Sequence, residues 1–117
     1  MFSDDDDRVQ DWLRDIIDNG DWIATYVGGL TLDEFVADRK TRDASERCLE
    51  RIIEASVRLG TERIARIADG QPLHKVRGLG NVLRHSYDAV DAKLIWDTLT
   101  EDVPALRAAC ERALAAG

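Results

Sequence analysis

Apolar residues recur every three or four positions along this chain, and this periodicity constrains its fold more than any other feature. Residues at that spacing lie on one face of a helix, and no stretch shows the alternating pattern typical of a strand. The chain contains only two prolines, Pro72 and Pro104, so long stretches are free to be helical. The sequence therefore predicts an all-α protein, folded as a bundle of four or five helices.

The periodicity also predicts where the helices lie. The first is expected to be continuous, because its apolar stripe stays in phase across Asn19-Gly20, and Gly28-Gly29 ends it. Thr31 and Glu34 form a capping box that begins the second. Pro104 is expected to kink or divide the last, with Thr100 or Asp102 capping its second piece. The predicted helices span residues 5–27, 32–37, 41–68, 73–86 and 91–115. In the fourth, Gly78 and Gly80 are poor helix formers, so either they serve close packing or the helix begins near Leu79.

The third of these helices is predicted to be unbroken over residues 41–68. Its apolar stripe includes the small residues Ser56 and Gly60, which we expect to let another helix approach closely. A stop and turn follows at residues 69–72, where an aspartate and a glycine precede Pro72.

The length and the cysteines limit the class of protein further. A chain of 117 residues is long enough for one domain with a single core, which we expect to span residues 1–117. Cys48 and Cys110 lie at helical spacing among apolar or small residues, so we expect buried free thiols. With two cysteines and two histidines in no convergent pattern, we expect no metal site and no cofactor. There is no signal peptide or membrane-spanning apolar run, which predicts a cytoplasmic protein.

Residues 70–87 contain no Asp or Glu, although the chain carries a net charge of −7. This charge argues against binding of nucleic acid over the whole surface, so any such contact must be local. The acid-free segment holds three basic residues and is the obvious candidate for binding an anion or a phosphate.

Four polar side chains of this segment share one face if it is helical: Arg77, Asn81, Arg84 and His85. At about 100° per residue, Asn81 and His85 differ by about 40° around the axis, and Arg77 and Arg84 by about 20°. Arginine binds phosphate in a bidentate manner, and histidine can take the proton from an attacking 2′-hydroxyl. A solvated helix surface has the same pattern, so the spacing alone leaves both interpretations open.

Glu54 is a further candidate in the third helix. It lies four residues before Arg58, which predicts an ordinary ion pair on the helix surface. The alternative is that Glu54 faces the acid-free segment and orients Arg77 or His85.

The string from Gly80 to Tyr87, followed by Val90-Asp91 and Ile95-Trp96-Asp97, resembles the HepT-like HEPN family. The segments 32–44, 52–55 and 101–106 also look like that family, in the expected order. These proteins are the toxin partners of minimal nucleotidyltransferase antitoxins.

The resemblance implies an up-and-down helical bundle that forms a homodimer, with the motif helices meeting in a shared cleft. It implies metal-independent cleavage of RNA by an arginine, a polar residue and a histidine. By position, Asn81 is the polar residue and His85 the histidine, whereas Tyr87 is the tyrosine to which the antitoxin attaches AMP in some members.

The sequence departs from the family at Gly80, where an arginine is expected directly before the polar residue. Arg77 lies one helical turn earlier and Arg84 is adjacent to His85, so either is a candidate to supply the guanidinium. Three hypotheses follow: an RNA-cleaving toxin, a degenerate HEPN module that binds RNA, nucleotide or its partner without cleavage, and a purely structural dimer.

Overall fold

The computed structural model describes residues 4–68 and 89–116 of the chain. These residues form helices and no strand, so the all-α prediction is confirmed. The elements are α1 (Asp4–Val27), α2 (Leu32–Ala37), α3 (Arg39–Leu59), α4 (Thr61–Ile67), α6 (Ala89–Asp97), the π-helix η1 (Thr98–Asp102) and α7 (Val103–Ala116).

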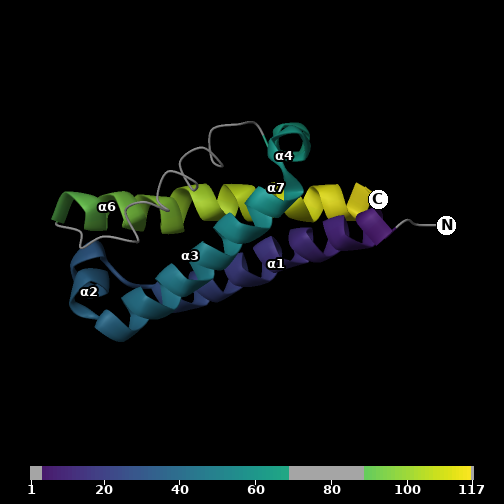
Figure 1. The fold of residues 1–117 in the computed structure, drawn as a ribbon. Helices are drawn as coiled ribbons and strands as arrows, with labels where there is room; N and C mark the ends of the chain where they lie inside the picture. Colours follow the sequence, from purple (N-terminus) through teal and green to yellow (C-terminus); the bar gives the residue numbers. More distant parts are fainter. Residues whose placement is uncertain (1–3, 69–88, 117) are drawn as a thin grey trace.

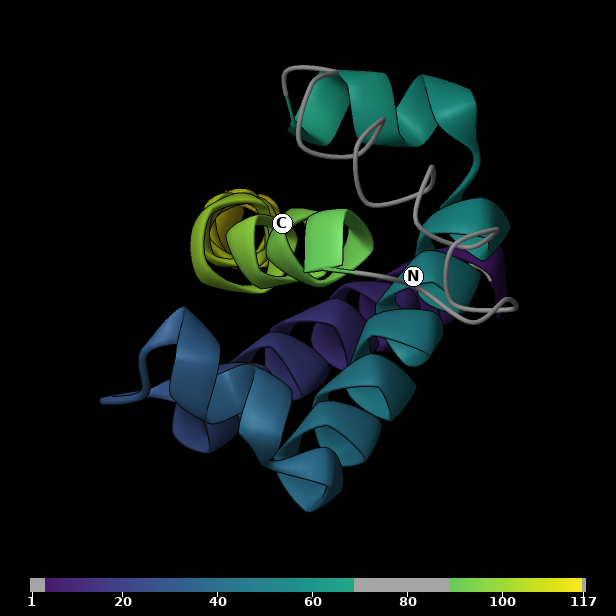
Figure 2. The ribbon, with the colours of Figure 1, turned by 90° about the vertical axis from the view of Figure 1, so that its left-hand side faces the viewer.

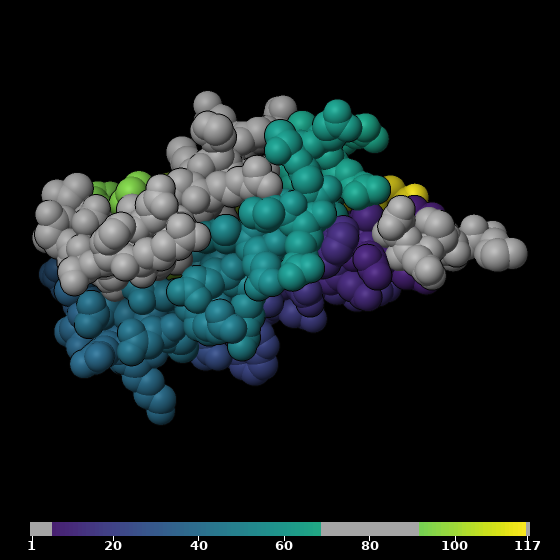
Figure 3. Space-filling view, in the orientation of Figure 1, coloured from purple at the N-terminus to yellow at the C-terminus, as the bar shows by residue number. Residues whose placement is uncertain are grey.

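The long helices pack side by side as a bundle. α1 and α3 are antiparallel neighbours, and α6, η1 and α7 follow one another as a rod that also packs against α1 (Figure 1). α2 lies at the end where α6 begins, and α4 crosses above α7 at the other end (Figure 2). In the space-filling view, α3 and α4 form much of one face, with α1 beside α3 (Figure 3). The core between the helices is built from aliphatic side chains and one aromatic ring. Its largest fully buried members are Phe35, Ile16, Ile23, Leu49, Ile52, Leu59, Ile64, Ile95, Leu99 and Leu106.

α1 is continuous from residue 4 to 27, as predicted from its unbroken apolar stripe. Gly20 lies within it and is buried. The helix ends at the predicted glycine pair, where Gly29 has a φ of 81° in the region that favours glycine.

The predicted capping box begins α2. The backbone N–H of Glu34 donates to the hydroxyl of Thr31 at 3.2 Å, and the backbone N–H of Thr31 donates to the Glu34 carboxylate at 3.0 Å. Each residue thereby satisfies a donor that the first helical turn leaves unpaired. The ring of Phe35 then packs against Trp96 of α6 at a centroid distance of 5.2 Å, which joins α2 to the bundle.

The single helix predicted over residues 41–68 is wrong, because the chain breaks at Gly60. α3 ends at Leu59 and α4 begins at Thr61, while Gly60 adopts φ 88° and ψ 154°. Only glycine adopts this backbone conformation readily. Gly60 therefore turns the chain instead of serving as a small residue on a helix face.

The last helical region is divided just before Pro104, as predicted. Proline has no N–H to donate and its ring clashes with the carbonyl four residues earlier, so the preceding turn widens to a π-helix. Its backbone bond runs from the N–H of Val103 to the carbonyl of Thr98. The expectation that Thr100 caps the second piece is wrong, since its hydroxyl donates back to the carbonyl of Trp96 at 2.8 Å.

Cys48 and Cys110 are both buried free thiols, as predicted. In the part of the chain that the structure describes, no helix is both long and apolar enough to cross a membrane. The helix predicted over residues 73–86 lies outside the described residues.

Candidate functional site

The five residues singled out in the acid-free segment lie outside the part of the chain that the structure describes. The chain on either side of that segment is anchored in the core. Before it, Ala68 is buried and its N–H donates to the carbonyl of Ile64 at 2.8 Å. After it, Ala92 and Ile95 of α6 are buried. The residues concerned are Arg77, Asn81, Arg84, His85 and Tyr87.

Glu54 lies within the described residues, on α3. Its carboxylate accepts a hydrogen bond from the guanidinium of Arg58 at 3.1 Å, and more than half of each side chain is exposed. The predicted surface ion pair is therefore confirmed. The alternative, that Glu54 orients Arg77 or His85, involves residues outside the described part and stays a prediction.

Around Glu54, α1 and α3 form a polar groove of about 350 Å³. Trp12 contributes its ring from α1, and the amide of Asn19 donates to the backbone carbonyl of Asp15 at 2.8 Å. Arg51 and Arg58 face them from α3. The full lining is Trp12, Asp15, Asn19, Arg51, Glu54, Ala55 and Arg58.

The acidic side of this groove is crowded. Burial raises the pKa of the Asp15 carboxyl above its ordinary value, and the negative charges of Asp11, Asp18 and Glu54 raise it further. With two carboxylates and two guanidinium groups, the groove has charges of both signs, which suits a small polar ligand more than a polyanion.

Sequence reasoning identified Glu54 in this groove but missed Trp12, Asp15 and Asn19. These residues lie on another helix, and only the packing of α1 against α3 brings them beside Glu54. In the sequence, each of the three residues occupies an ordinary position on an amphipathic helix. Among the described residues, no group of three or more His, Cys, Asp or Glu side chains is placed to hold a metal ion.

Comparison with known proteins gives a family match over most of the chain. The model of a family described as "Ribonuclease HepT-like" matches residues 16–113. No solved structure matches the chain significantly.

Among curated proteins, the chain is similar to the "Probable ribonuclease HepT" of Thermococcus cleftensis. The two are 30% identical over 103 residues, which cover 88% of this chain and 93% of the relative. Two proteins of Methanocaldococcus jannaschii with provisional RNase names are also similar. One is 33% identical over a stretch that covers 82% of this chain and 78% of its own length. The other is 29% identical over a stretch that covers 85% of this chain and 90% of its own length.

Proposed function

The chain belongs to the HepT-like ribonuclease family, and from this premise we propose that it is the toxin of a toxin–antitoxin pair and cleaves RNA without a metal ion. The observation that carries the proposal is the acid-free segment in a chain of net charge −7, with Arg77, Asn81, Arg84 and His85 in the family's motif region. A local cluster of positive charge on an acidic background is what a phosphate-binding site in such a protein requires.

In the proposed mechanism, the imidazole of His85 takes the proton from a ribose 2′-hydroxyl. The 2′-oxygen forms a bond to phosphorus, and the bond from phosphorus to the 5′-oxygen breaks as that oxygen takes a proton from water. His85 then returns the proton that it accepted to the solvent. The products are a 2′,3′-cyclic phosphate and a 5′-hydroxyl. Arg77 and Arg84 bind the phosphate and stabilise the charge that develops on it, while Asn81 positions the phosphate or the base.

We propose that two copies of the chain form the site together. A two-fold axis duplicates the acid-free segment and concentrates its positive charge in one cleft, which explains how an acidic protein attracts RNA. The two copies of His85 are then expected to lie within the span of a few nucleotides. A minimal nucleotidyltransferase is the proposed antitoxin, and Tyr87 the side chain to which it attaches AMP.

The test is RNA cleavage by protein purified without its partner, in buffer that contains a chelator. Removal of a catalytic acid or base typically costs about 10²–10⁴-fold in rate. We expect His85→Ala to lose cleavage by that factor and His74→Ala, which removes the only other histidine, to cleave like the parent. Equal cleavage by His85→Ala and the parent would exclude the mechanism.

A second candidate function is favoured by one residue, Gly80, which stands where the family has an arginine. In this alternative the protein binds RNA or a nucleotide but does not cleave it. RNA affinity that falls in Arg77→Ala or Arg84→Ala, without turnover in the parent, would support it. Gly80→Arg restores the family pattern, and cleavage gained only in this variant would assign the loss of activity to that position.

A further inference from the structure

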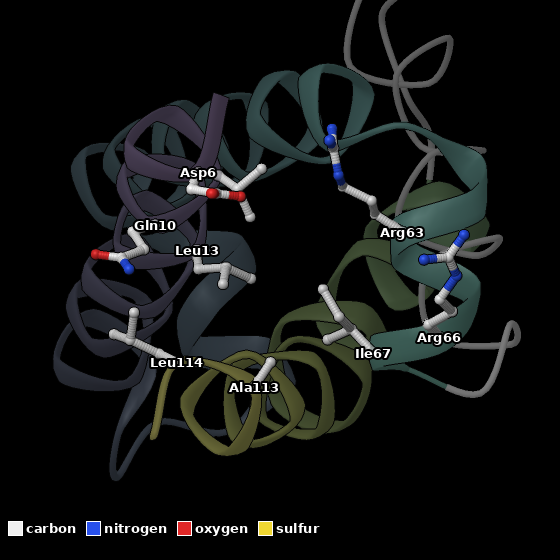
Figure 4. A pocket seen from close by; sticks show the side chains of 9 residues that line it. Asp6, Gln10, Leu13, Arg63, Arg66, Ile67, Ala113 and Leu114 are labelled. Carbon is white, nitrogen blue, oxygen red and sulfur yellow. The ribbon is translucent and has the colours of Figure 1, made fainter. Parts of the chain in front are cut away.

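A second hollow, of about 370 Å³, lies where the beginning of α1, α4 and the end of α7 meet (Figure 4). Its floor is apolar, because it is the edge of the core: Leu13 is buried, and Ile67 and Leu114 are half-buried. Its rim is polar and comes from two helices. The lining residues are Asp6, Val9, Gln10, Leu13, Arg63, Arg66, Ile67, Ala113 and Leu114.

The break at Gly60 builds this hollow. Its positive φ turns the chain at the end of α3, so that α4 crosses over α7 (Figure 2). The apolar side of α4 at Ile64 then packs into the core, whereas Ile67 remains at its edge. A continuous helix through Gly60 would carry these residues in another direction.

Two arginines of α4, Arg63 and Arg66, occupy one side of the rim (Figure 4). They are three residues apart and therefore neighbours on the helix surface. The guanidinium of Arg66 lies 4.0 Å from the carboxylate of Glu62, and these side chains are 78% and 92% exposed. An ion pair so long and so exposed contributes little, so this guanidinium is available to another anion.

Asp6 and Gln10 of α1 lie on the other side, one helical turn apart, and the carboxylate of Asp6 points toward the hollow whereas the amide of Gln10 points away from it (Figure 4). A carboxylate accepts hydrogen bonds, so it matches an amino group at the edge of a nucleobase. The hollow thus combines aliphatic walls for a flat ring, a carboxylate for its edge and arginines for phosphate. Its size is in the range of about 300–1,000 Å³ that is usual for small-molecule sites.

We propose that this hollow is an accessory RNA-binding subsite that holds one unpaired nucleotide of the substrate strand. The base lies against the apolar floor beside Asp6, and Arg63 and Arg66 bind the phosphates that flank it. The inference rests on the proposed function, since it names where the substrate is held outside the candidate catalytic residues. α4 directly precedes the acid-free segment in sequence.

The test measures binding of a single-stranded 2′-O-methyl oligonucleotide, which lacks the attacking hydroxyl and stays intact. Fluorescence anisotropy compares the parent with the double variant Arg63→Ala/Arg66→Ala over a range of salt concentrations. For single strands the salt slope falls by about 0.7 for each lost phosphate contact, so we expect a decrease of about 1.4. We expect the affinity to fall about tenfold, which corresponds to roughly 1.4 kcal/mol.

The matched control is Arg39→Ala/Arg47→Ala, which removes the same charge from α3. Both side chains are exposed and form ion pairs within their own helix, at 3.7 Å to Asp43 and 3.1 Å to Glu50. We expect this control to bind the oligonucleotide with the parent's salt slope.

A second pair of variants tests the floor. Ala113→Leu adds a side chain to the hollow, whereas Ala105→Leu adds the same group to an exposed position of α7. We expect the first to weaken binding about tenfold and the second to leave it unchanged. Thermal unfolding of both variants establishes that each is folded.

Three outcomes overturn the inference. The first is that the parent does not bind the oligonucleotide. The second is that the α4 double variant binds it with unchanged affinity and salt slope. The third is that the α4 double variant loses binding to the nucleotidyltransferase and not to RNA. The last would assign the surface to a protein partner. If cleavage depends on His85 but not on Arg63 and Arg66, the proposed nuclease is supported and the subsite is excluded. If binding depends on the two arginines but the protein does not cleave RNA, the subsite is supported and the nuclease is excluded.

Discussion

Arg107 of α7 binds Asp21 of α1, across 86 positions of sequence. Its Nε donates to Oδ1 at 2.9 Å and its Nη2 to Oδ2 at 3.4 Å, and it also pairs with Glu111 one turn further along α7. The hydrogen bond to Asp21 raises the pKa of the guanidinium above its ordinary value. To reach Asp21, the side chain of Arg107 crosses α1 directly over Gly20.

This crossing explains a glycine in the middle of a long helix. A Cβ at position 20 would lie 3.1 Å from Cγ and 3.2 Å from Cβ of Arg107, closer than ordinary van der Waals contact. An interior glycine costs a helix about 1 kcal/mol relative to alanine. Gly20 therefore lowers the local stability of α1 but allows α7 to approach closely.

The first prediction uses this relationship in a double-mutant cycle. Gly20→Ala gains helix propensity but displaces Arg107, so we expect little net change in the free energy of unfolding. In an Arg107→Ala background the contact with Cγ is gone and only the Cβ contact at 3.2 Å remains, so the same substitution should be more favourable than in the parent, by up to about 1 kcal/mol. Urea denaturation of the four proteins measures both steps, and equal effects in the two backgrounds would contradict the explanation.

The second prediction concerns Gly60. Its φ of 88° and ψ of 154° lie in a region that side chains avoid, and a residue held there costs about 1–3 kcal/mol. We therefore expect Gly60→Ala to lower the free energy of unfolding by that amount, although nothing lies within 4 Å of the added Cβ. An unchanged stability of Gly60→Ala would mean that the turn tolerates a side chain.

These two glycines show what local sequence patterns determine. The capping box at Thr31 and Glu34 and the end of α1 were predicted correctly, because each is set by residues within a few positions. The break at Gly60 was not. Ile64 and Ile67 keep the helical spacing of the preceding stripe, and glycine fits both a helix and a turn, so periodicity could not distinguish them.

The candidate sites show the same difference between features set by nearby residues and features set by the packing of distant ones. The acid-free segment and the Glu54–Arg58 pair were recognised because charge and spacing are properties of the sequence itself. The hollow beneath Arg63 and Arg66 was missed, since it is made by three helices whose residues are far apart along the chain. Only the direction in which Gly60 turns α4 brings them together.

The third prediction is a pH dependence at Asp38, which caps α3. Its carboxylate accepts hydrogen bonds from the hydroxyl of Thr41 at 2.7 Å and from the backbone N–H of Thr41 at 3.1 Å. The side-chain bond, followed by the backbone bond, lowers the pKa of Asp38 below its ordinary value of 3.8.

A lowered pKa in the folded protein means that the stabilising contribution is present above pH 3.8. It is lost as the pH falls below that value, through the pKa of the folded state. Asp38→Asn keeps a capping oxygen but has no charge to lose. We expect its free energy of unfolding to fall less steeply than that of the parent below pH 3.8. Parallel curves in acid would show that Asp38 contributes nothing to the pH dependence.

The last prediction concerns the two buried thiols. Burial raises the pKa of Cys110 to about 11, and it also raises the pKa of Cys48, although Arg51 and Arg47 partly oppose that shift. Because only the thiolate reacts, and about one Cys110 in a thousand is ionised at pH 8, alkylation of the folded protein should be slow.

The rate at Cys110 should rise about tenfold for each pH unit up to its pKa, as long as the fold persists. Addition of urea should make both thiols react at the rate of an exposed cysteine, because unfolding removes the burial that raises their pKa values. Iodoacetamide labelling read by mass spectrometry, with Cys48→Ala and Cys110→Ala to separate the two sites, measures each rate. Rapid labelling of Cys110 in the native protein at pH 8 would show that α7 opens far more often than a core helix should.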